Sequence, residues 1–309
     1  MTERVLGTDT SHWTGSINFD TMYNAGAKFW ITKATDANKL TGYQFEDYKF
    51  MEFSRAAFEH DKILTGCYHW LQLSVDPKVA ADFYLERYKR FYFDFPPVLD
   101  FEEHQAIDTG RFSDYAWRAQ VWLDHVAQKT GRKPIIYTAK WFMDYFKLEQ
   151  VSWMIEYPLW VADYTWTSNT LGYPTRMPKP WSKQAMWQFS ADGNKRGAEF
   201  GTGAIDIDLN WFDGSYNNLI DFIGGEIIPE PPPVIPPIQE VILPKLKVID
   251  DVRIRTSTST ASLDNFLRMR KVGEIVNVKE IYVKNGQSVW VRDNEGWSAV
   301  VHYGYRYME

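Results

Sequence analysis

Between residues 5 and about 223, short apolar runs of strand character alternate with longer segments whose apolar residues recur every three or four positions. Alternation of these two patterns is typical of repeated βα units. The runs that read as strands are residues 5–9, 29–35, 64–71, 97–102, 134–138, 159–164, 185–189 and 205–210. Because there are eight of them, the pattern predicts a closed α/β barrel.

The clearest helical pattern lies between the fourth and fifth predicted strands. Its apolar residues recur at a spacing of three and four: Phe112, Tyr115, Ala116, Ala119, Trp122, Leu123 and Val126. A stripe of this kind packs a helix against a sheet. After the sixth predicted strand, residues 165–183 are rich in Pro, Gly, Ser and Thr. We therefore expect the last third of the barrel to lack regular helices.

A proline-rich segment separates this part of the chain from the rest. Residues 229–244 contain seven prolines, a composition that favours an extended, semi-rigid spacer. Beyond it, residues 248–254, 274–283, 288–292 and 297–301 read as short strands, separated by the turn-like Asn285-Gly286 and Asn294-Glu295-Gly296. The sequence predicts a barrel over residues 1–224, a linker over 225–244 and a small all-β domain over 245–309.

Composition narrows the function classes. A formal net charge of −6, without runs of Lys or Arg, makes nucleic acid a poor candidate partner. No apolar segment has the length of a membrane span or a secretory signal, so we expect synthesis in the cytoplasm without a signal peptide. The single cysteine, Cys67, lies in an apolar run and is expected to be a buried strand residue.

Acidic residues stand at the ends of predicted strands, where barrel enzymes place their active sites. They are Asp9, Asp100, Glu102 and either Asp206 or Asp208. Asp100 and Glu102 are two positions apart, so on one strand both carboxyls point to the same face. Crowded, buried carboxyls raise one another's pKa, and a neutral acid beside an ionised one suits the cleavage of a glycosidic bond. The structural alternative is that these acids cap loops or pair with surface lysines.

Aromatic residues are unusually frequent, with 14 Trp, 18 Tyr and 19 Phe. Rings in an open cleft can stack on sugars, although burial is the default role of any one ring. Five rings in or at the ends of predicted strands are candidates for substrate binding: Tyr68, Tyr137, Trp160, Tyr164 and Trp187. Core packing is the alternative for each of them.

The histidines His12, His69 and His104 do not show the spacing of a zinc-binding helix. We expect them to be polar scaffolding, and we expect no metal and no cofactor. The immediate neighbour of the acidic pair, Glu103, should face the opposite side of its strand and is given a structural role.

With these residues in view, the first 223 positions resemble the glycoside hydrolase family 25 lysozymes. The resemblance rests on pieces at eight strands: Gly7-Thr8-Asp9-Thr10-Ser11, Phe29-Trp30-Ile31-Thr32-Lys33-Ala34-Thr35, Gly66-Cys67-Tyr68-His69-Trp70, Asp100-Phe101-Glu102, Ile136-Tyr137-Thr138, Leu159-Trp160-Val161-Ala162, Trp187-Gln188-Phe189-Ser190 and Asp208-Leu209-Asn210. It implies a TIM-like barrel of the (β/α)5(β)3 type. It also implies cleavage of the β-1,4 bond between N-acetylmuramic acid and N-acetylglucosamine in bacterial peptidoglycan.

Carried over onto this chain, the resemblance makes Glu102 the general acid and Asp100, Asp9 and Asp208 its acidic partners. Asp208 is preferred because it begins the Asp-x-Asn piece, which leaves Asp206 as a substrate-binding candidate. Whether Asp100 acts as a nucleophile or orients the acetamido group of the substrate stays open. The chain departs from the family at residues 36–40, which lack the usual glycine-containing stretch.

The tail resembles bacterial SH3-like domains in residues 252–256, in residues 273–278, and in Trp290 with Gly296-Trp297. This implies attachment to the cell wall, with a spacer or dimerisation module as the alternative. Taken together, the resemblances suggest a phage endolysin that is made in the host bacterium and acts on the wall after release. The alternatives are an inactive wall-binding protein and a different glycosidase, such as an endo-N-acetylglucosaminidase or chitinase.

Overall fold

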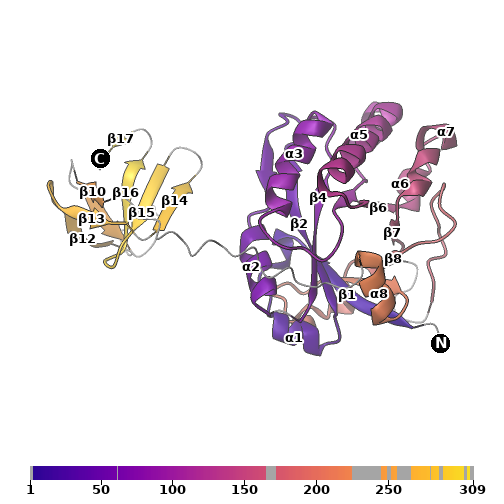
Figure 1. Cartoon of the computed structure of the whole chain (residues 1–309), viewed down its shortest axis with the longest axis horizontal. Coiled ribbons are helices and arrows are strands. Elements are labelled where there is room, and N and C mark those ends of the chain that lie inside the picture. Colours follow the sequence, from indigo (N-terminus) through magenta and orange to yellow (C-terminus); the bar gives the residue numbers. More distant parts are fainter. Residues whose placement is uncertain are drawn as a thin grey trace. The chain divides into compact units, whose positions relative to one another are not determined.

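A computed structural model describes residues 3–60, 62–164, 172–224, 245–248, 252–255, 266–278, 280–284, 288–302 and 305–306. The chain divides into two compact units, Met1–Ile228 and Pro229–Glu309 (Figure 1). The division falls inside the predicted linker 225–244, which lies outside the described residues.

The first unit is a closed barrel. Its strands are β1 (Arg4–Thr10), β2 (Phe29–Ala37), β4 (Leu64–Trp70), β5 (Val98–Asp100), β6 (Ile135–Ala139), β7 (Leu159–Ala162), β8 (Met186–Ser190) and β9 (Asp208–Asp213). They pair in that order, and β9 pairs back with β1. The first seven are parallel, whereas β9 is antiparallel to both of its neighbours. The predicted closed α/β barrel is confirmed. The short β3 (Gln44–Glu46), which pairs antiparallel with the end of β2, was not predicted.

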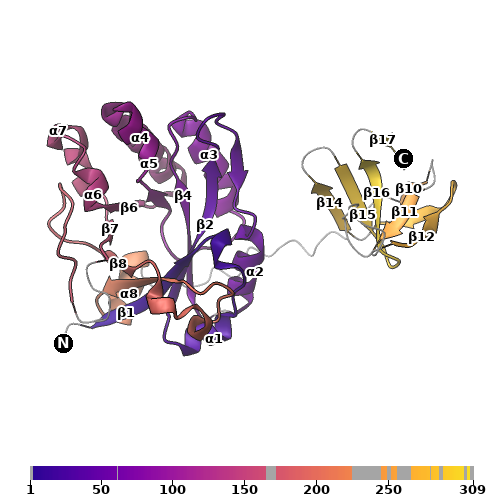
Figure 2. The same ribbon diagram turned by 180° about the vertical axis from the view of Figure 1, so that it is seen from behind.

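Helices surround the strands (Figures 1 and 2). They are α1 (Phe19–Asn24), α2 (Phe50–His60), α3 (Pro77–Tyr88), α4 (His104–Thr109), α5 (Phe112–Thr130), α6 (Lys140–Met143), α7 (Leu148–Val151) and α8 (Tyr216–Ile223). The first five barrel strands are each followed by at least one helix. Between β7 and β8 the described residues hold no helix, and only short 3-10 turns precede β9. This is the expected (β/α)5(β)3 arrangement.

Two apolar cores follow from the alternation of side chains along the strands. One lies between the strands and the helices, where α5 buries the six core residues from Tyr115 to Val126 that its spacing predicted. The other fills the barrel and includes Val5, Phe29, Val98 and Phe212. Gly7 is required at this level, because a Cβ there would lie 2.3 Å from the ring of Phe29. The amino-terminal half of the barrel is therefore packed solid.

The second unit consists of short antiparallel strands: β10 (Lys245–Lys247), β11 (Val252–Arg255), β12 (Phe266–Arg270), β13 (Ile275–Asn277), β14 (Glu280–Lys284), β15 (Ser288–Arg292), β16 (Trp297–His302) and β17 (Tyr305–Arg306). The predicted strand 274–283 is divided into β13 and β14, and of the predicted strand 248–254 only the part from Val252 belongs to a strand, β11. The strands β10, β12 and β17 were not predicted. The predicted turn Asn285-Gly286 lies outside the described residues.

One buried cation organises part of the second unit. The guanidinium of Arg270 is 2% exposed, donates to the hydroxyl of Ser298 at 3.0 Å and pairs with Asp293 at 2.7 Å. Because an unpaired buried charge is costly, these partners hold β12 to β16 and to the loop before it.

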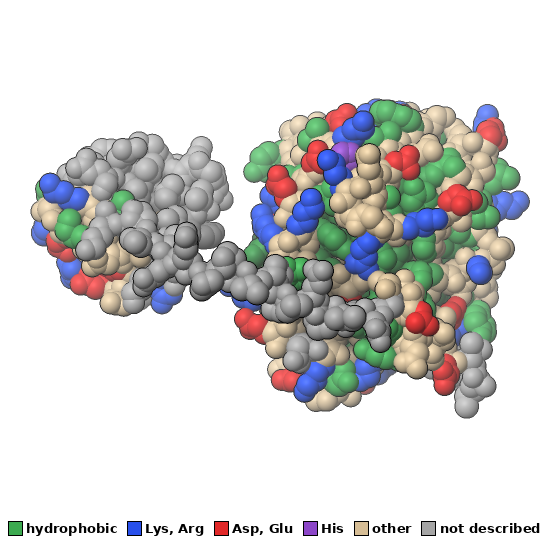
Figure 3. Space-filling model, viewed as in Figure 1, with side chains coloured by type: hydrophobic (Ala, Val, Ile, Leu, Met, Phe, Trp, Pro, Cys, Tyr) green, Lys and Arg blue, Asp and Glu red, His purple; other side chains and the backbone are tan. Residues whose placement is uncertain are grey.

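The surface of the first unit is mixed in charge. On the face seen in Figure 3, Lys and Arg side chains are interspersed with Asp and Glu, without a continuous stripe of one sign. Within the described ranges, no helix combines the length and the apolar character that a membrane crossing needs.

Candidate active site

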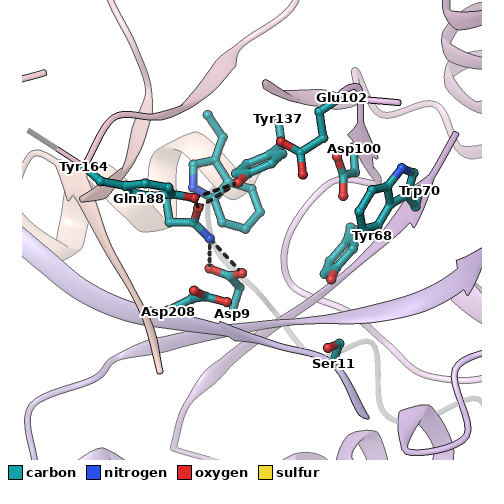
Figure 4. Close-up of a pocket in the computed structure, with 11 residues that line it drawn as sticks. Asp9, Ser11, Tyr68, Trp70, Asp100, Glu102, Tyr137, Tyr164, Gln188 and Asp208 are labelled. Atoms are coloured by element: carbon teal, nitrogen blue, oxygen red, sulfur yellow. Dashed lines mark hydrogen bonds between the residues drawn. The ribbon is translucent and has the colours of Figure 1, made fainter. Parts of the chain in front are cut away.

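Polar side chains replace the apolar core at the carboxyl ends of the parallel strands. They line a pocket of about 230 Å³ formed by Asp9, Ser11, Tyr68, Trp70, Asp100, Glu102, Tyr137, Trp160, Tyr164, Gln188 and Asp208 (Figure 4). These residues come from β1, β4, β5, β6, β7, β8 and β9 or from the loops that follow them. This is the end of an α/β barrel at which active sites are found.

The direction of β9 explains how Asp208 reaches this end. Because β9 runs antiparallel to β1, its first residue lies beside the carboxyl end of β1. The register places Asp208 directly opposite Asp9. Both carboxyls line the pocket, so two acids far apart in the sequence form a close pair.

The Asp9 carboxylate is held by amide groups. Gln188 donates from Nε2 to both of its oxygens, at 2.8 and 3.0 Å, and Asn210 donates from Nδ2 to Oδ1 at 2.6 Å. The two amides are oriented in turn: Tyr137 donates to Oε1 of Gln188 at 2.7 Å, and Trp160 donates to Oδ1 of Asn210 at 2.8 Å. Because the aromatic side chains occupy the amide oxygens, the NH2 group of each amide is the end that points to Asp9.

Burial dominates the proton affinity of this pair. It raises the pKa of Asp9 to about 6, although hydrogen bonds from Asn210, Gln188 and Asp208 pull the other way. The pKa of Asp208 is raised well above its usual range, first by burial and then by the negative charge of Asp9. We infer that the pair holds one proton, carried by Asp208 and shared with an ionised Asp9.

Asp100 and Glu102 form the second acidic pair. The strand β5 ends at Asp100, earlier than predicted, yet both acids line the pocket because the residue between them points outward. The ring of Phe101 is buried and stacks on Tyr115 at 4.6 Å, and its carbonyl accepts a hydrogen bond from Thr138 at 2.8 Å. The anchored Phe101 therefore continues the alternation beyond the strand.

This second pair has few polar partners. Oδ1 of Asp100 is buried without a hydrogen-bond partner among the described residues. Burial, followed by the charge of Glu102, raises the pKa of Asp100 well above its usual range. The pKa of Glu102 is raised to about 7, by burial first and then by the charge of Asp9. Near neutral pH, Glu102 can therefore hold a proton and release it to a substrate.

A buried lysine, which the sequence analysis did not single out, supplies positive charge near this pair. Lys33 on β2 is 6% exposed, pairs with Asp36 at 2.5 Å and lies 4.3 Å from the ring centre of Trp70. Its charge lowers the pKa of both Asp100 and Glu102, against the larger effect of burial. Lys33 therefore favours an ionised carboxylate in the pair.

The predicted site residues divide into two groups. The structure brings Asp9, Asp100, Glu102 and Asp208 into one pocket, together with four of the five candidate aromatic residues: Tyr68, Tyr137, Trp160 and Tyr164. It does not bring Trp187 or Asp206 there.

Trp187 is a correction. It is buried on the outer side of β8, where its Nε1 donates to the carbonyl of Asp163 at 2.9 Å and its ring meets Phe189. Its neighbour Gln188 points into the pocket instead, because successive residues of a strand face opposite sides.

Asp206 is a second correction. The predicted strand 205–210 begins only at Asp208, so Asp206 does not share its face. The Asp206 side chain is exposed and pairs with Lys195 at 2.6 Å. Pairing with a surface lysine is the structural role that the sequence analysis gave as the alternative for these acids.

Three pocket residues were not singled out as site residues: Ser11, Trp70 and Gln188. All three lie in the sequence pieces that carry the family resemblance. For Trp70 the available signal was the alternation that places it on the same face as the predicted Tyr68. For Gln188 alternation gave no signal, because its neighbour Trp187 was the residue predicted to line the cleft. Ser11 lies just beyond β1, where alternation no longer applies.

The other polar candidates have structural partners. His12 contacts Asp47 at 2.6 Å, His69 contacts Thr35 at 2.8 Å, and His104 stacks on Trp141. Burial, and then the charge of Lys33, lowers the pKa of His69 to about 3. Glu103 accepts from the backbone N–H of Gln105 at 2.8 Å and caps α4. Over the described ranges, no three His, Cys, Asp or Glu residues are grouped as a metal site.

The fold and the pocket define a class: an α/β-barrel hydrolase with paired acids of raised pKa at its catalytic end. The sequence model of the family described as "Glycosyl hydrolases family 25" matches residues 8–198, which is more than half of the chain. The chain therefore belongs to glycosyl hydrolase family 25 and is a glycoside hydrolase.

Individual relatives agree with this membership. The chain is 31% identical to the uncharacterized protein YegX of Escherichia coli O6:H1 over 226 residues, covering 72% of this chain and 74% of that protein. It is 30% identical to lysozyme M1 of Streptomyces globisporus over 233 residues, covering 71% of each. The crystal structure of the bacterial lysozyme from Streptomyces coelicolor shares the fold, with a TM-score of 0.56, 24% identity, and 72% of this chain and 98% of that chain covered.

Proposed function

We propose that the chain is a muramidase that hydrolyses the β-1,4 bond between N-acetylmuramic acid and N-acetylglucosamine in peptidoglycan. The observation that carries this is the Asp100–Glu102 pair, a raised-pKa acid beside a second carboxyl at the catalytic end of a family 25 barrel. The relatives named lysozyme M1 and N,O-diacetylmuramidase, the latter from Arthroderma benhamiae at 25% identity over 72% of this chain and 87% of that protein, support the same activity.

In this reaction Glu102 donates its proton to the glycosidic oxygen as the bond from that oxygen to the anomeric carbon breaks. The anomeric carbon gains oxocarbenium character, and the reactive state of the coupled pair is the one with the proton on Glu102 and the negative charge on Asp100, where that charge stabilises the carbon. Water later supplies a hydroxyl to that carbon, and its proton returns to the Glu102 carboxylate. Glu102 is then protonated again, as it was before the reaction.

Asp100 can serve this reaction in two ways: as a nucleophile, or by orienting the acetamido oxygen of the substrate for attack. Both give a product that retains the β configuration, whereas direct attack by water inverts it. Nuclear magnetic resonance of the first anomer released separates retention from inversion.

The test of the bond assignment is mass spectrometry of purified peptidoglycan digested by the intact protein, with borohydride reduction to mark new reducing ends. Reduced muramic acid is the expected product. Reduced glucosamine would change the assignment to an endo-N-acetylglucosaminidase, and the absence of new ends would favour the inactive wall-binding protein.

For the second unit we propose an SH3-like module that binds the cell wall. Its short antiparallel strands and its separation as a compact unit support this, together with the sequence pieces that resemble bacterial SH3-like domains. A weak second binding site on the same polymer raises the local concentration of the barrel. Deleting residues 245–309 should reduce lysis of intact cells more than cleavage of soluble fragments; equal losses would contradict a targeting role.

We also propose that the chain is an endolysin of phage type, made inside a bacterium and active on the wall after release. The combination of a wall-cutting barrel with a separate small unit prompts this proposal. In a bacterium that expresses the chain, full-length protein should stay with the cytosol until the membrane is permeabilised. Its appearance outside intact cells would contradict the proposal.

A further inference from the structure

Three aromatic side chains form an exposed cluster beside the pocket. The ring of His12 lies 4.6 Å from the ring of Trp13 and 4.9 Å from the ring of Tyr48, measured between centroids. Trp13 is 82% exposed and Tyr48 is 73% exposed. We call His12, Trp13 and Tyr48 the aromatic platform. Large rings left this open contribute little to the core and are typical of binding surfaces.

The aromatic platform is fixed by a buried carboxylate. Asp47 is 2% exposed and accepts from the backbone N–H of His12 at 3.2 Å, from the ring Nδ1 of His12 at 2.6 Å and from the backbone N–H of Lys49 at 3.0 Å. The backbone N–H of Asp47 donates to the carbonyl of Ala34 on β2 at 2.9 Å. The ring of His12, against which Trp13 and Tyr48 lie, is therefore held in place before any ligand arrives, which lowers the entropic cost of binding.

The aromatic platform is continuous with the pocket. Ser11 lines the pocket, and its side chain accepts from the backbone N–H of Trp13 at 3.4 Å. His12 and Trp13 follow directly in the turn His12–Thr14 at the carboxyl end of β1. A polymer that leaves the pocket past Ser11 can therefore reach these rings.

The pocket is too small to hold a glycan strand, so the strand must extend beyond it. Its volume of about 230 Å³ is below the range of roughly 300–1,000 Å³ in which proteins enclose small ligands. A glycan strand is a polymer, so most of its sugars must lie outside this pocket. Amphipathic rings suit a sugar, which presents C–H groups on its faces and hydroxyls at its edge.

We propose that His12, Trp13 and Tyr48 form an additional sugar-binding subsite, which stacks a residue of the peptidoglycan glycan strand beyond those held in the acidic pocket. This inference rests on the proposed muramidase function. The subsite binds uncharged sugar faces and takes no part in proton transfer. It makes the enzyme prefer long glycan strands to short ones.

The test compares glycan oligosaccharides of two lengths, a tetrasaccharide and an octasaccharide prepared from peptidoglycan. The variants are Trp13→Ala and Tyr48→Ala. The matched control is Trp117→Ala, which removes an exposed tryptophan from α5 instead. Loss of one stacking contact should lower kcat/KM on the octasaccharide about tenfold, through KM, for Trp13→Ala, and less for Tyr48→Ala. On the tetrasaccharide all variants should stay close to the parent.

A second measurement separates binding from folding and chemistry. In the Glu102→Gln background, calorimetric titration with the octasaccharide should show the same loss of affinity on Trp13→Ala, and Trp13→Phe should restore most of it. Thermal unfolding should be unchanged, because the ring is mostly in solvent.

Failure of this inference is distinguishable from failure of the muramidase assignment. If the parent cuts both oligosaccharides and Trp13→Ala behaves like the parent on both, the subsite is wrong and the muramidase stands. Equal losses on both lengths also overturn it. If sedimentation shows a parent dimer that Trp13→Ala converts to a monomer with unchanged kinetics, a second copy of the chain occupies the platform and the sugar is excluded. If the parent releases no muramic reducing ends, both proposals fall.

Discussion

The two acidic pairs in the pocket have the same kind of side chain and different surroundings. Asp9, paired with Asp208, accepts three hydrogen bonds from the amides of Gln188 and Asn210. Across the pocket, Oδ1 of Asp100 has no partner among the described residues, and within the same ranges no hydrogen bond to the carboxyl of Glu102 is found (Figure 4). Hydrogen bonds therefore fix the position of the first pair. The second pair lacks such bonds, so one of its carboxyls can exchange a proton with a substrate.

This difference arises because burial acts on both pairs while hydrogen bonding acts mainly on one. Burial raises the pKa of Asp9 to about 6 and that of Glu102 to about 7. Amide donors stabilise the ionised form of Asp9, whereas a neutral Glu102 carries no charge that such donors would have to compensate. A carboxyl that remains protonated near neutral pH is the one that can act as general acid.

The largest effect should come from removing the proton donor. Glu102→Gln keeps the size of the side chain and should lower kcat on peptidoglycan by about a thousandfold, within the range for loss of a general acid. The variant should still fold, because no hydrogen bond to this carboxyl is found in the described part of the chain. The measurement is the rate of release of reducing ends, together with thermal unfolding.

The matched control is the neighbouring acid. Glu103 caps α4 through the backbone N–H of Gln105, so Glu103→Gln should weaken folding by about 1 kcal/mol and leave most of the activity. If Glu102→Gln retained appreciable lytic activity, the assignment of the general acid would be wrong.

The next effect concerns stability and should separate the pairs directly. In Asp9→Asn, the introduced amide meets the donors of Gln188 and Asn210, so at least one buried donor loses its acceptor. We expect the free energy of unfolding to fall by about 1–3 kcal/mol at pH 7. Asp100→Asn should instead leave stability unchanged or raise it, since it removes a buried acid with few partners, although activity is lost. If chemical denaturation showed that Asp9→Asn and Asp100→Asn destabilise the fold equally, the proposed difference between the two acidic pairs would be wrong.

The pH dependence of stability provides a smaller, more specific signature. The folded-state pKa of Glu102, about 7, is above its ordinary value of 4.5, so the folded chain binds the proton more tightly than the unfolded chain does. The stability this contributes is complete below about pH 4.5 and is lost as the pH rises through about 7.

Glu102→Gln should therefore flatten the fall in unfolding free energy between pH 4.5 and pH 7, by on the order of 1 kcal/mol for this partly exposed group. In the parent, kcat/KM should decline above about pH 7, as Glu102 loses its proton. Urea denaturation at several pH values measures the first effect. A variant with the same slope as the parent would place the titration on another acid of the pocket.

Much of the barrel could be predicted from the sequence, because its strands and its longest helix follow simple periods. The pattern of α5 specifies the face that it buries, and each of the eight predicted runs overlaps one strand of the barrel. The short β3 was missed, since its three residues, Gln44–Glu46, are too few to show alternation. The boundary at Asp208 was missed because Ile205 and Ile207 continue an alternation that the backbone does not follow.

The sequence predicted the acidic residues of the candidate site better than its other side chains. Acids at strand ends are costly to bury, so their positions signal function. Trp187 and Gln188 show the limit: both lie within β8, and which one faces the pocket depends on the phase of alternation in that strand. Lys33 was missed because a lysine in an apolar strand gives no indication of its buried partner, Asp36, until the chain is folded.

The smallest expected effect decides between two acids that the sequence left as alternatives. Asp206 is exposed and pairs with Lys195, so Asp206→Asn should change the free energy of unfolding by no more than about 0.5 kcal/mol and leave the activity intact. Asp208 lies opposite Asp9 and shares its proton, so Asp208→Asn should lower kcat while KM changes little. Parallel kinetics of the two variants on peptidoglycan test this. A large loss of activity in Asp206→Asn would mean that this exposed acid contacts the glycan. The substrate-binding site would then include residues that precede β9.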